Sequence, residues 1–276
     1  MTSQDQKFAR FRAMHHGPGA LVMPNPWDAG STRILEALGF EALATTSAGY
    51  AFSIAERDSA SRLGRDAIIE NARAIVAATD LPVSADLENG FGHQPADCAA
   101  TIDAAIAAGL VGGSIEDATG DPDAPIYPMD AAVARIKAAA DAARGRPFLL
   151  TARAENFLWG RPDLDDTIAR LRAFADAGAD VLYAPGLPDL AAIRRVCAAV
   201  DRPVNVVMGL RPPFYTVKEL AAAGVRRISV GGSFARAALG GLITAARELR
   251  DAGSFTYADS APSGAELARL LYRDGK

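Results

Sequence analysis

Short apolar runs alternate along this chain with longer, alanine-rich amphipathic stretches. The runs have the length of buried strands and number about eight. They lie near residues 20–24, 42–46, 82–87, 112–116, 148–153, 181–184, 203–208 and 226–230. Repeated strand-then-helix units predict a parallel sheet, and eight of them predict closure into a (β/α)8 barrel of the TIM type.

The helical stretches share a recurring ending. Examples of these stretches are Asp66–Ala78, Ala96–Ala108, Met129–Arg144, Leu164–Ala177 and Phe234–Leu249. Four helices end in an alanine-containing phrase that runs into a glycine, at Gly39, Gly109, Gly178 and Gly224. A glycine there supplies the left-handed cap from which the chain enters the next strand. These turns mark the lower face of the barrel, so we expect function at the opposite face.

Length and composition fit one large domain. The chain has 276 residues, of which 50% are hydrophobic, and a barrel of this length is ordinarily a single domain, here 1–276. Residues 251–276 contain a Pro-Ser-Gly break before a last amphipathic stretch. We interpret them as a C-terminal helical arm that packs on a partner subunit.

The charge and apolar content of the chain limit the classes of partner that it is expected to bind. The net charge is −4, with acids and bases interspersed, so no basic stripe suggests nucleic acid or a membrane surface. The first residues are polar and no run is long enough to span a membrane, which favours the cytoplasm. Cys98 and Cys197 fall in alanine-rich helical stretches, where thiols act as small apolar fillers.

Charged residues collect where three successive strands end. Asp86 and Glu88 follow an apolar strand, Glu116 ends the next strand, and Arg153 with Glu155 ends the third. An isolated Asp-x-Glu is most often a turn cap and a solvated strand end. Three successive strands that each place charge at the mouth of a barrel are explained better by a functional site than by caps and solvated ends. Carboxylate oxygens are suitable ligands for Mg²⁺.

Other residues at the strand ends could bind a 2-oxo acid and stabilise the enolate formed from it. A cation ringed by carboxylates, with Arg153 nearby, would chelate a 2-oxo acid and stabilise an enolate, while Ser47 and Asn205 offer polar contacts. A Schiff base would need a lysine at a strand end, and none falls there. Gly231-Gly232 precedes a helix and either binds phosphate or merely allows close packing.

Several segments together resemble the isocitrate lyase and phosphoenolpyruvate mutase superfamily, from about residue 8 to about residue 250. The segments are Asn25-Pro26-Trp27-Asp28-Ala29, Thr45-Thr46-Ser47-Ala48-Gly49, Ser84-Ala85-Asp86-Leu87-Glu88-Asn89-Gly90-Phe91-Gly92, Ser114-Ile115-Glu116-Asp117, Thr151-Ala152-Arg153 and Gly178-Ala179-Asp180. The resemblance implies a barrel whose last helix is exchanged between subunits of a homodimer or homotetramer. It also implies cleavage of a C–C or P–C bond beside an oxo acid with Mg²⁺, or with Mn²⁺ as the alternative.

The resemblance also assigns roles by position. It assigns the substrate carboxylate loop to Ser47, Ala48 and Gly49, the metal to Asp86, Glu88 and Glu116, and substrate contact or catalysis to Arg153 and Asp58. Mutases typically carry aspartate where this chain has Glu88. The extra methylene should move that carboxylate, so we expect metal contacts largely through water.

The loop at 118–128 departs from the superfamily. Lyases carry a Lys-Lys-Cys-Gly-His loop there, and phosphonopyruvate enzymes carry a lysine and an asparagine; this loop has no Cys, Lys, His or Asn. What remains is the metal-enolate core, which favours an oxaloacetate-like substrate and a lyase or hydrolase reaction. Tyr127 is either the proton donor or an aromatic anchor between prolines. His93 receives no role.

Three alternatives stay open. One is P–C bond chemistry on phosphonopyruvate or phosphoenolpyruvate, and another is a barrel that binds a metabolite without turning it over. A third is a phosphosugar barrel that uses Gly231 and Gly232. The fold alone does not separate them, because this barrel hosts many chemistries.

Overall fold

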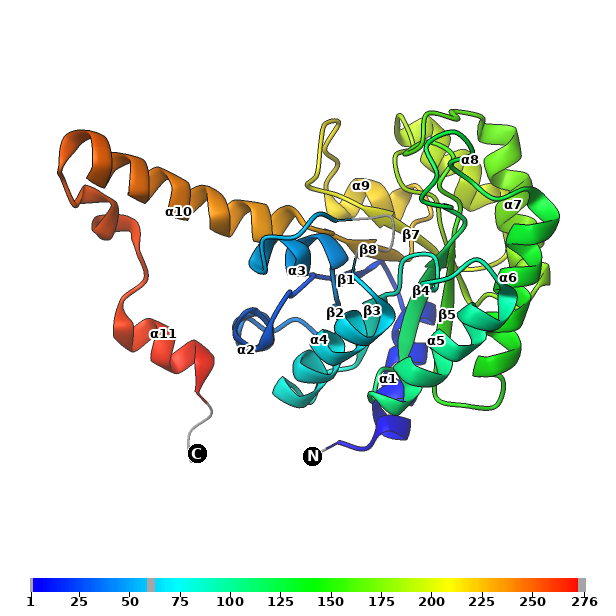
Figure 1. Cartoon of the computed structure of the whole chain (residues 1–276), viewed down its shortest axis with the longest axis horizontal. Helices are drawn as coiled ribbons and strands as arrows, with labels where there is room; N and C mark the ends of the chain where they lie inside the picture. Colours follow the sequence, from blue (N-terminus) through cyan, green and yellow to red (C-terminus); the bar gives the residue numbers. More distant parts are fainter. Residues whose placement is uncertain (1, 59–62, 273–276) are drawn as a thin grey trace.

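Eight parallel strands form a nearly closed barrel in the computed structural model, which describes residues 2–58 and 63–272 (Figure 1). The strands are β1 (Leu21–Met23), β2 (Leu43–Ala44), β3 (Val83–Asp86), β4 (Gly112–Glu116), β5 (Leu149–Arg153), β6 (Val181–Tyr183), β7 (Val204–Val207) and β8 (Arg227–Ser229). Their order is β1-β8-β7-β6-β5-β4-β3-β2. At the seam between β1 and β2, the Ala44 N–H donates to the Pro24 carbonyl at 3.1 Å. The predicted TIM-type barrel is confirmed.

Helices alternate with the strands along the chain. They are α1 (Gln4–His16), α2 (Ala29–Ala37), α3 (Ser47–Ser53), α4 (Arg65–Ala78), α5 (Pro95–Ala107), α6 (Met129–Ala143), α7 (Leu164–Asp176), α8 (Leu190–Ala199), α9 (Val217–Ala222), α10 (Ser233–Ala252), the 3-10 helix η1 (Thr256–Ser260) and α11 (Gly264–Leu271). Gly39, Gly109, Gly178 and Gly224 all have positive φ angles, between 89° and 110°. The predicted left-handed caps at the lower face are therefore confirmed.

The first helix lies against the lower part of the barrel. Phe11 is fully buried, and a Cβ added to Gly112 on β4 would lie 2.9 Å from its ring. His15 packs edge-on against Phe11, and its Nδ1 lies 2.8 Å from the Phe11 carbonyl oxygen. The lower part of the barrel is thus filled by an apolar cluster with one buried imidazole.

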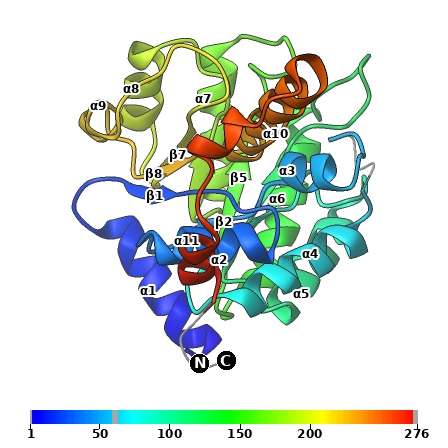
Figure 2. The same cartoon turned by 90° about the vertical axis from the view of Figure 1, so that its left-hand side faces the viewer.

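The helix after the last strand leaves the barrel. The sequence predicts a helix there correctly, but the only buried residue of α10 is Ala235, in its first turn. The rest of α10 projects away from the barrel in Figure 1, and α11 turns back to lie against α2, as Figures 1 and 2 show. Leu239, Leu242 and Ile243 on α10 are exposed. This helix therefore has an apolar face that its own chain does not cover.

Two further sequence expectations concern thiols and membranes. Cys98 is buried and Cys197 is half-buried, and both are free thiols. Within residues 2–58 and 63–272, no helix has the length and apolar character that crossing a membrane requires.

Candidate active site at the barrel mouth

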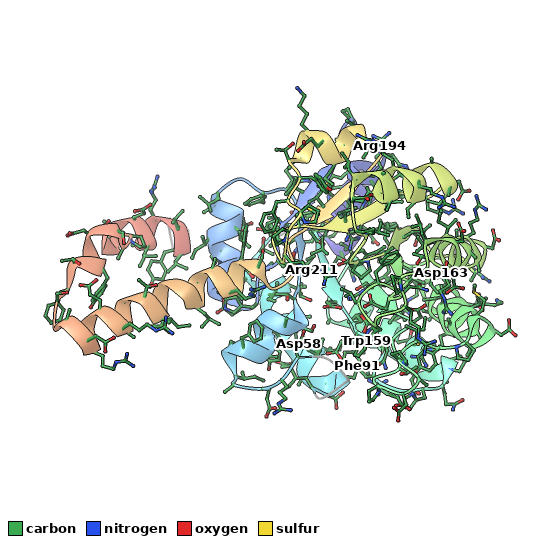
Figure 3. The ribbon with its side chains drawn as sticks, turned by 90° about the horizontal axis from the view of Figure 1, so that it is seen from above. Asp58, Phe91, Trp159, Asp163, Arg194 and Arg211 are labelled. Carbon is green, nitrogen blue, oxygen red and sulfur yellow. The ribbon has the colours of Figure 1, made fainter. Side chains whose placement is uncertain are left out.

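A cavity of about 430 Å³ opens at the carboxyl ends of the strands. Most of the residues that the sequence points to line it: Ser47, Ala48, Asp58, Asp86, Glu88, Glu116, Arg153 and Asn205. Seen from above, Asp58, Trp159 and Arg211 surround this opening, whereas Arg194 lies on the outer side of the barrel (Figure 3). Gly49 and Tyr127 do not line it.

Arg153 organises the acids of this cavity. It is the last residue of β5 and pairs in register with Glu116, the last residue of β4. Its guanidinium lies 2.9 Å from carboxylate oxygens of Asp86, Glu116 and Glu155. The Arg153 side chain is only 12% exposed. One buried cation therefore holds three carboxylates from three neighbouring strands at the same point.

Burial and crowding shift the pKa values of this cluster. Burial raises the pKa of Glu116 well above its ordinary value; Arg153 opposes this shift, and the carboxylates of Glu155, Asp86 and Glu88 add to it. Burial also raises the pKa of Glu155, again against the effect of Arg153. Burial alone would lower the pKa of Arg153, but its three carboxylate partners raise it. The arginine is thus charged, and the cluster holds more acid than base.

Glu88 reaches the cavity through an unusual backbone conformation. Strand β3 ends at Asp86, and Glu88 has a φ of 46°, in the left-handed region that side chains other than glycine and asparagine rarely adopt. Its carbonyl accepts from the Glu116 N–H at 2.9 Å, which fixes the turn against β4. Strain of this kind often accompanies functional positions. Although Glu88 lies beyond the end of β3, Asp86 and Glu88 both line the cavity.

Ser47 links two further acids at the start of α3. Its Oγ lies 2.9 Å from Asp58 Oδ1 and 3.0 Å from Asp86 Oδ2, so its single proton is shared between two carboxylates. Gly49 lies behind this point, with its N–H donated to Thr46 Oγ1. A Cβ on Gly49 would lie 2.7 Å from the Thr46 side chain. Close packing therefore explains this glycine.

The predicted loop residue Tyr127 lies outside the cavity. Its hydroxyl is 2.7 Å from His93 Nδ1, and the guanidinium of Arg135 stacks over its ring at 4.3 Å from the ring centre. The Tyr127 carbonyl accepts from Arg170 at 2.9 Å, and Arg170 also pairs with Asp117. None of the residues 118–128 lines the cavity. In this conformation Tyr127 is the aromatic anchor that the sequence offered as the alternative.

The glycine pair before α10 is also explained by packing. Asn25 Oδ1 accepts from the N–H groups of Val230 and Gly231 at 2.8 and 2.9 Å. A Cβ on Gly232 would approach Ala48 to 3.2 Å. Since these two backbone donors already have an acceptor, the packing interpretation of Gly231-Gly232 is favoured over phosphate binding.

Arg227 on β8 and Tyr183 on β6 are among the cavity-lining residues that sequence reasoning missed. Arg227 donates from Nε to Asn205 Oδ1 and from Nη1 to Thr151 Oγ1, both at 3.0 Å. Tyr183 lies under Arg153, whose guanidinium carbon is 5.1 Å from the ring centre. The only available signal was the Arg226-Arg227 pair inside an apolar strand.

Comparison with known proteins identifies the family. The family model for phosphoenolpyruvate phosphomutase matches residues 11–250, which is most of the chain. The chain belongs to the isocitrate lyase/phosphoenolpyruvate mutase superfamily. The resemblance found in the sequence is therefore confirmed, and the chain is a member of an enzyme superfamily.

The relatives of this chain within the superfamily are named for different reactions. A crystal structure of a provisionally assigned lyase/mutase from Burkholderia cenocepacia J2315 is 57% identical, with a TM-score of 0.95 over 98% of this chain and 97% of that one. The 2-methylisocitrate lyase of Escherichia coli is 28% identical over 76% of this chain and 77% of its own length. An oxaloacetate decarboxylase of Chromohalobacter salexigens is 27% identical, over 87% and 84% respectively.

The acids that line the barrel mouth offer carboxylate oxygens, which suit a hard divalent cation. Among the described residues, no three His, Cys, Asp or Glu side chains are grouped closely enough to hold a metal ion. Magnesium typically keeps several waters and uses one or two carboxylates. The excess of carboxylate over guanidinium around Arg153, with the raised pKa of Glu116, fits a cation held largely through water.

Proposed function

We propose that this protein is a Mg²⁺-dependent lyase or hydrolase that cleaves a C–C bond beside a small 2-oxo or 2-hydroxy carboxylate, with an oxaloacetate-like substrate favoured. The observation that carries the proposal is the cluster of Asp86, Glu116 and Glu155 around Arg153, each with a carboxylate oxygen 2.9 Å from the guanidinium, in a cavity of about 430 Å³. That volume suits a small metabolite.

Each residue has a defined part in this proposal. Asp86, Glu88 and Glu116 would hold the cation, mainly through water, and Mn²⁺ would serve as the alternative ion. When bound, the ion supplies positive charge beside the substrate oxygens. Arg153 neutralises the negative charge that develops on the substrate when the bond breaks. Ser47, with Asp58 as its acceptor, lies where it can donate to a substrate carboxylate instead.

The remaining predicted residues take smaller parts. Ala48 lines the cavity beside Ser47, whereas Gly49 supports that turn by packing. Asn205 has its amide oxygen occupied by Arg227 and its amide nitrogen 3.1 Å from Ser229 Oγ, so it supports the binding surface. A role for Tyr127 as proton donor would need the 118–128 loop to move over the cavity, as catalytic loops do in many enzymes.

The decisive experiment follows substrate loss and product release, pyruvate from a lyase or oxalate from a hydrolase, over a panel of 2-oxo and 2-hydroxy dicarboxylates, each assayed with Mg²⁺ and with chelator. We expect chelator-sensitive turnover that Asp86→Asn abolishes. Asp176→Asn, which removes an exposed acid at the end of α7, is the matched control and should keep full activity. Turnover that survives both the chelator and Asp86→Asn would contradict the proposal.

A second candidate is P–C bond chemistry, because the matching family model is that of phosphoenolpyruvate phosphomutase. Phosphonopyruvate belongs in the same panel for this reason. Its conversion, in the absence of C–C cleavage, would favour this candidate. Magnesium-dependent stabilisation by oxalate without any product would instead indicate a barrel that binds its ligand without turning it over.

A second copy of this chain is the proposed partner of the exposed face of α10. Leu239, Leu242 and Ile243 recur at helical spacing and are between 37% and 64% exposed. Contiguous apolar surface of this kind marks an interface. We expect light scattering to give a homodimer or homotetramer and Leu242→Lys to shift it toward the monomer; Lys218→Leu would not. A monomeric wild-type protein would contradict this part of the proposal.

A further inference from the structure

The interior of the cavity holds a second arginine, which has no acidic partner in the described part of the chain. Arg227 is 4% exposed and extends from β8 to Thr151 on β5. It forms no ion pair with any residue in 2–58 or 63–272, and its Nη2 donates no hydrogen bond within those ranges. A guanidinium has five N–H donors and is costly to bury without an anion.

Strand register places this arginine deeper than the acid cluster. Its acceptor Thr151 precedes Arg153 by two residues on β5. Two residues of a strand rise about 7 Å, so Arg227 reaches the barrel interior roughly one layer of side chains below Arg153. Arg227 also precedes Ser229, the last residue of β8, by two positions. The cavity is therefore acidic at its mouth and cationic at its floor.

Tyr183 adds a second donor to the cavity, and this donor has no acceptor among the described residues. It is the register partner of both Arg153 and Asn205, and it lines the same cavity. Within the described ranges its hydroxyl makes no hydrogen bond to the protein. Burial raises the pKa of Tyr183, so the phenol keeps its proton and acts as a donor. Burial also lowers the pKa of Arg227 to about 10, which leaves it charged at neutral pH.

We propose that Arg227 and Tyr183 form an anion subsite at the floor of the cavity that binds a second carboxylate of the substrate, distal to the reacting end. The arginine is held for this purpose, because Asn205 and Thr151 fix its Nε and Nη1 and leave Nη2 toward the cavity. Arginine is suited to carboxylates by its planar set of donors. The separation between Arg153 and Arg227, about one layer of side chains, matches the length of a short dicarboxylate.

This subsite rests on the proposed function, and it narrows the substrate to dicarboxylates. A monocarboxylate would leave Arg227 buried without a counter-charge, so its binding would lack this contribution. The subsite thus distinguishes acids that share a reacting end and differ only at the other end.

Binding of matched pairs of acids tests the subsite. Calorimetric titration in Mg²⁺ would compare 2-oxoglutarate with 2-oxopentanoate, and malate with 2-hydroxybutyrate, in which a methyl group replaces the distal carboxylate. We expect the dicarboxylate of at least one pair to bind about tenfold or more tightly. Arg227→Met should remove this preference and leave the affinity for the monocarboxylate unchanged, which also shows that the variant is folded.

Arg194→Met is the control, because it removes an exposed arginine on α8 and should keep the preference. Tyr183→Phe removes only a hydroxyl and should reduce the preference a few-fold, which keeps the test open if Arg227→Met fails to fold. Equal affinities within both pairs, or a preference that survives in Arg227→Met, would overturn the subsite while Mg²⁺-dependent binding of the acids still supports the proposed function. No Mg²⁺-dependent binding of any of the four acids would overturn both.

Discussion

Two arginines in one barrel experience opposite surroundings. Arg153 at the mouth has carboxylate oxygens of Asp86, Glu116 and Glu155 at 2.9 Å, whereas Arg227 below it bonds, among the residues that the structure describes, only to neutral oxygens of Asn205 and Thr151. The pKa of the first arginine is raised and that of the second falls to about 10. Charge in this barrel is thus arranged in layers, with excess acid above and excess base below.

Removal of the upper arginine should have the largest effect on stability. Arg153→Met leaves Glu116 and Glu155 buried without their cation, so we expect the free energy of unfolding to fall by about 3–5 kcal/mol at pH 8. The loss should shrink toward pH 5.5, because the raised pKa values let these carboxylates take up protons. Urea denaturation at the two pH values measures this, with Arg194→Met as the control. A fall in the free energy of unfolding of less than about 1 kcal/mol would contradict the view that Arg153 holds the carboxylate cluster together.

The buried imidazole of His15 makes stability depend on pH in the layer near Arg227. Burial lowers the pKa of His15 to about 4 from its ordinary 6.5, and the charge of Arg227 adds to this. Because the unfolded chain binds the proton first, the stability present above pH 6.5 is lost as the pH falls to about 4, by about 3 kcal/mol in total. Urea denaturation across this range should show the loss in the wild type and in His16→Gln, but much less of it in His15→Leu.

Neutralisation of one upper carboxylate should stabilise the protein while it removes function. The raised pKa of Glu116 means that its contribution to stability is present below pH 4.5 and is lost as the pH rises through its folded value. In chelator at pH 8, we expect Glu116→Gln to raise the free energy of unfolding by about 1 kcal/mol, with no difference near pH 4.5. Added Mg²⁺ should stabilise the wild type and not the variant. A Glu116→Gln protein that is less stable at pH 8 would contradict this assignment.

Removal of the lower arginine should have the smallest effect on stability. Arg227→Met loses two hydrogen bonds but also a buried charge without an anion, so we expect a change of about 1 kcal/mol or less in either direction. The acid-induced loss that His15 causes should become smaller, because the nearby positive charge is gone. Thermal unfolding at pH 7 and pH 5 checks both. A loss as large as that of Arg153→Met would mean that the two arginines are equivalent.

The strands and the upper acid layer follow from local sequence. Each predicted strand range contains an observed strand, because apolar runs and glycine caps are short-range signals. Asp86, Glu116 and Arg153 lie together because strand ends in a parallel barrel meet at one face, whatever the details of packing. Local sequence did not predict the position of Tyr127. Whether its side chain enters the cavity or packs as an anchor depends on how the 118–128 loop folds against His93 and Arg170.

Which of two neighbouring arginines enters the barrel depends on contacts between strands that are distant in the sequence. Arg226 points outward and bonds to the Gly19 carbonyl at 3.3 Å, while Arg227 is buried beside Asn205. The alternation of side chains along a strand requires one of them to face inward, but the choice is made by the register of β8 against β7, where Arg227 pairs with Asn205. Local sequence patterns therefore specify the barrel and its acidic mouth, whereas long-range strand pairing specifies its basic floor.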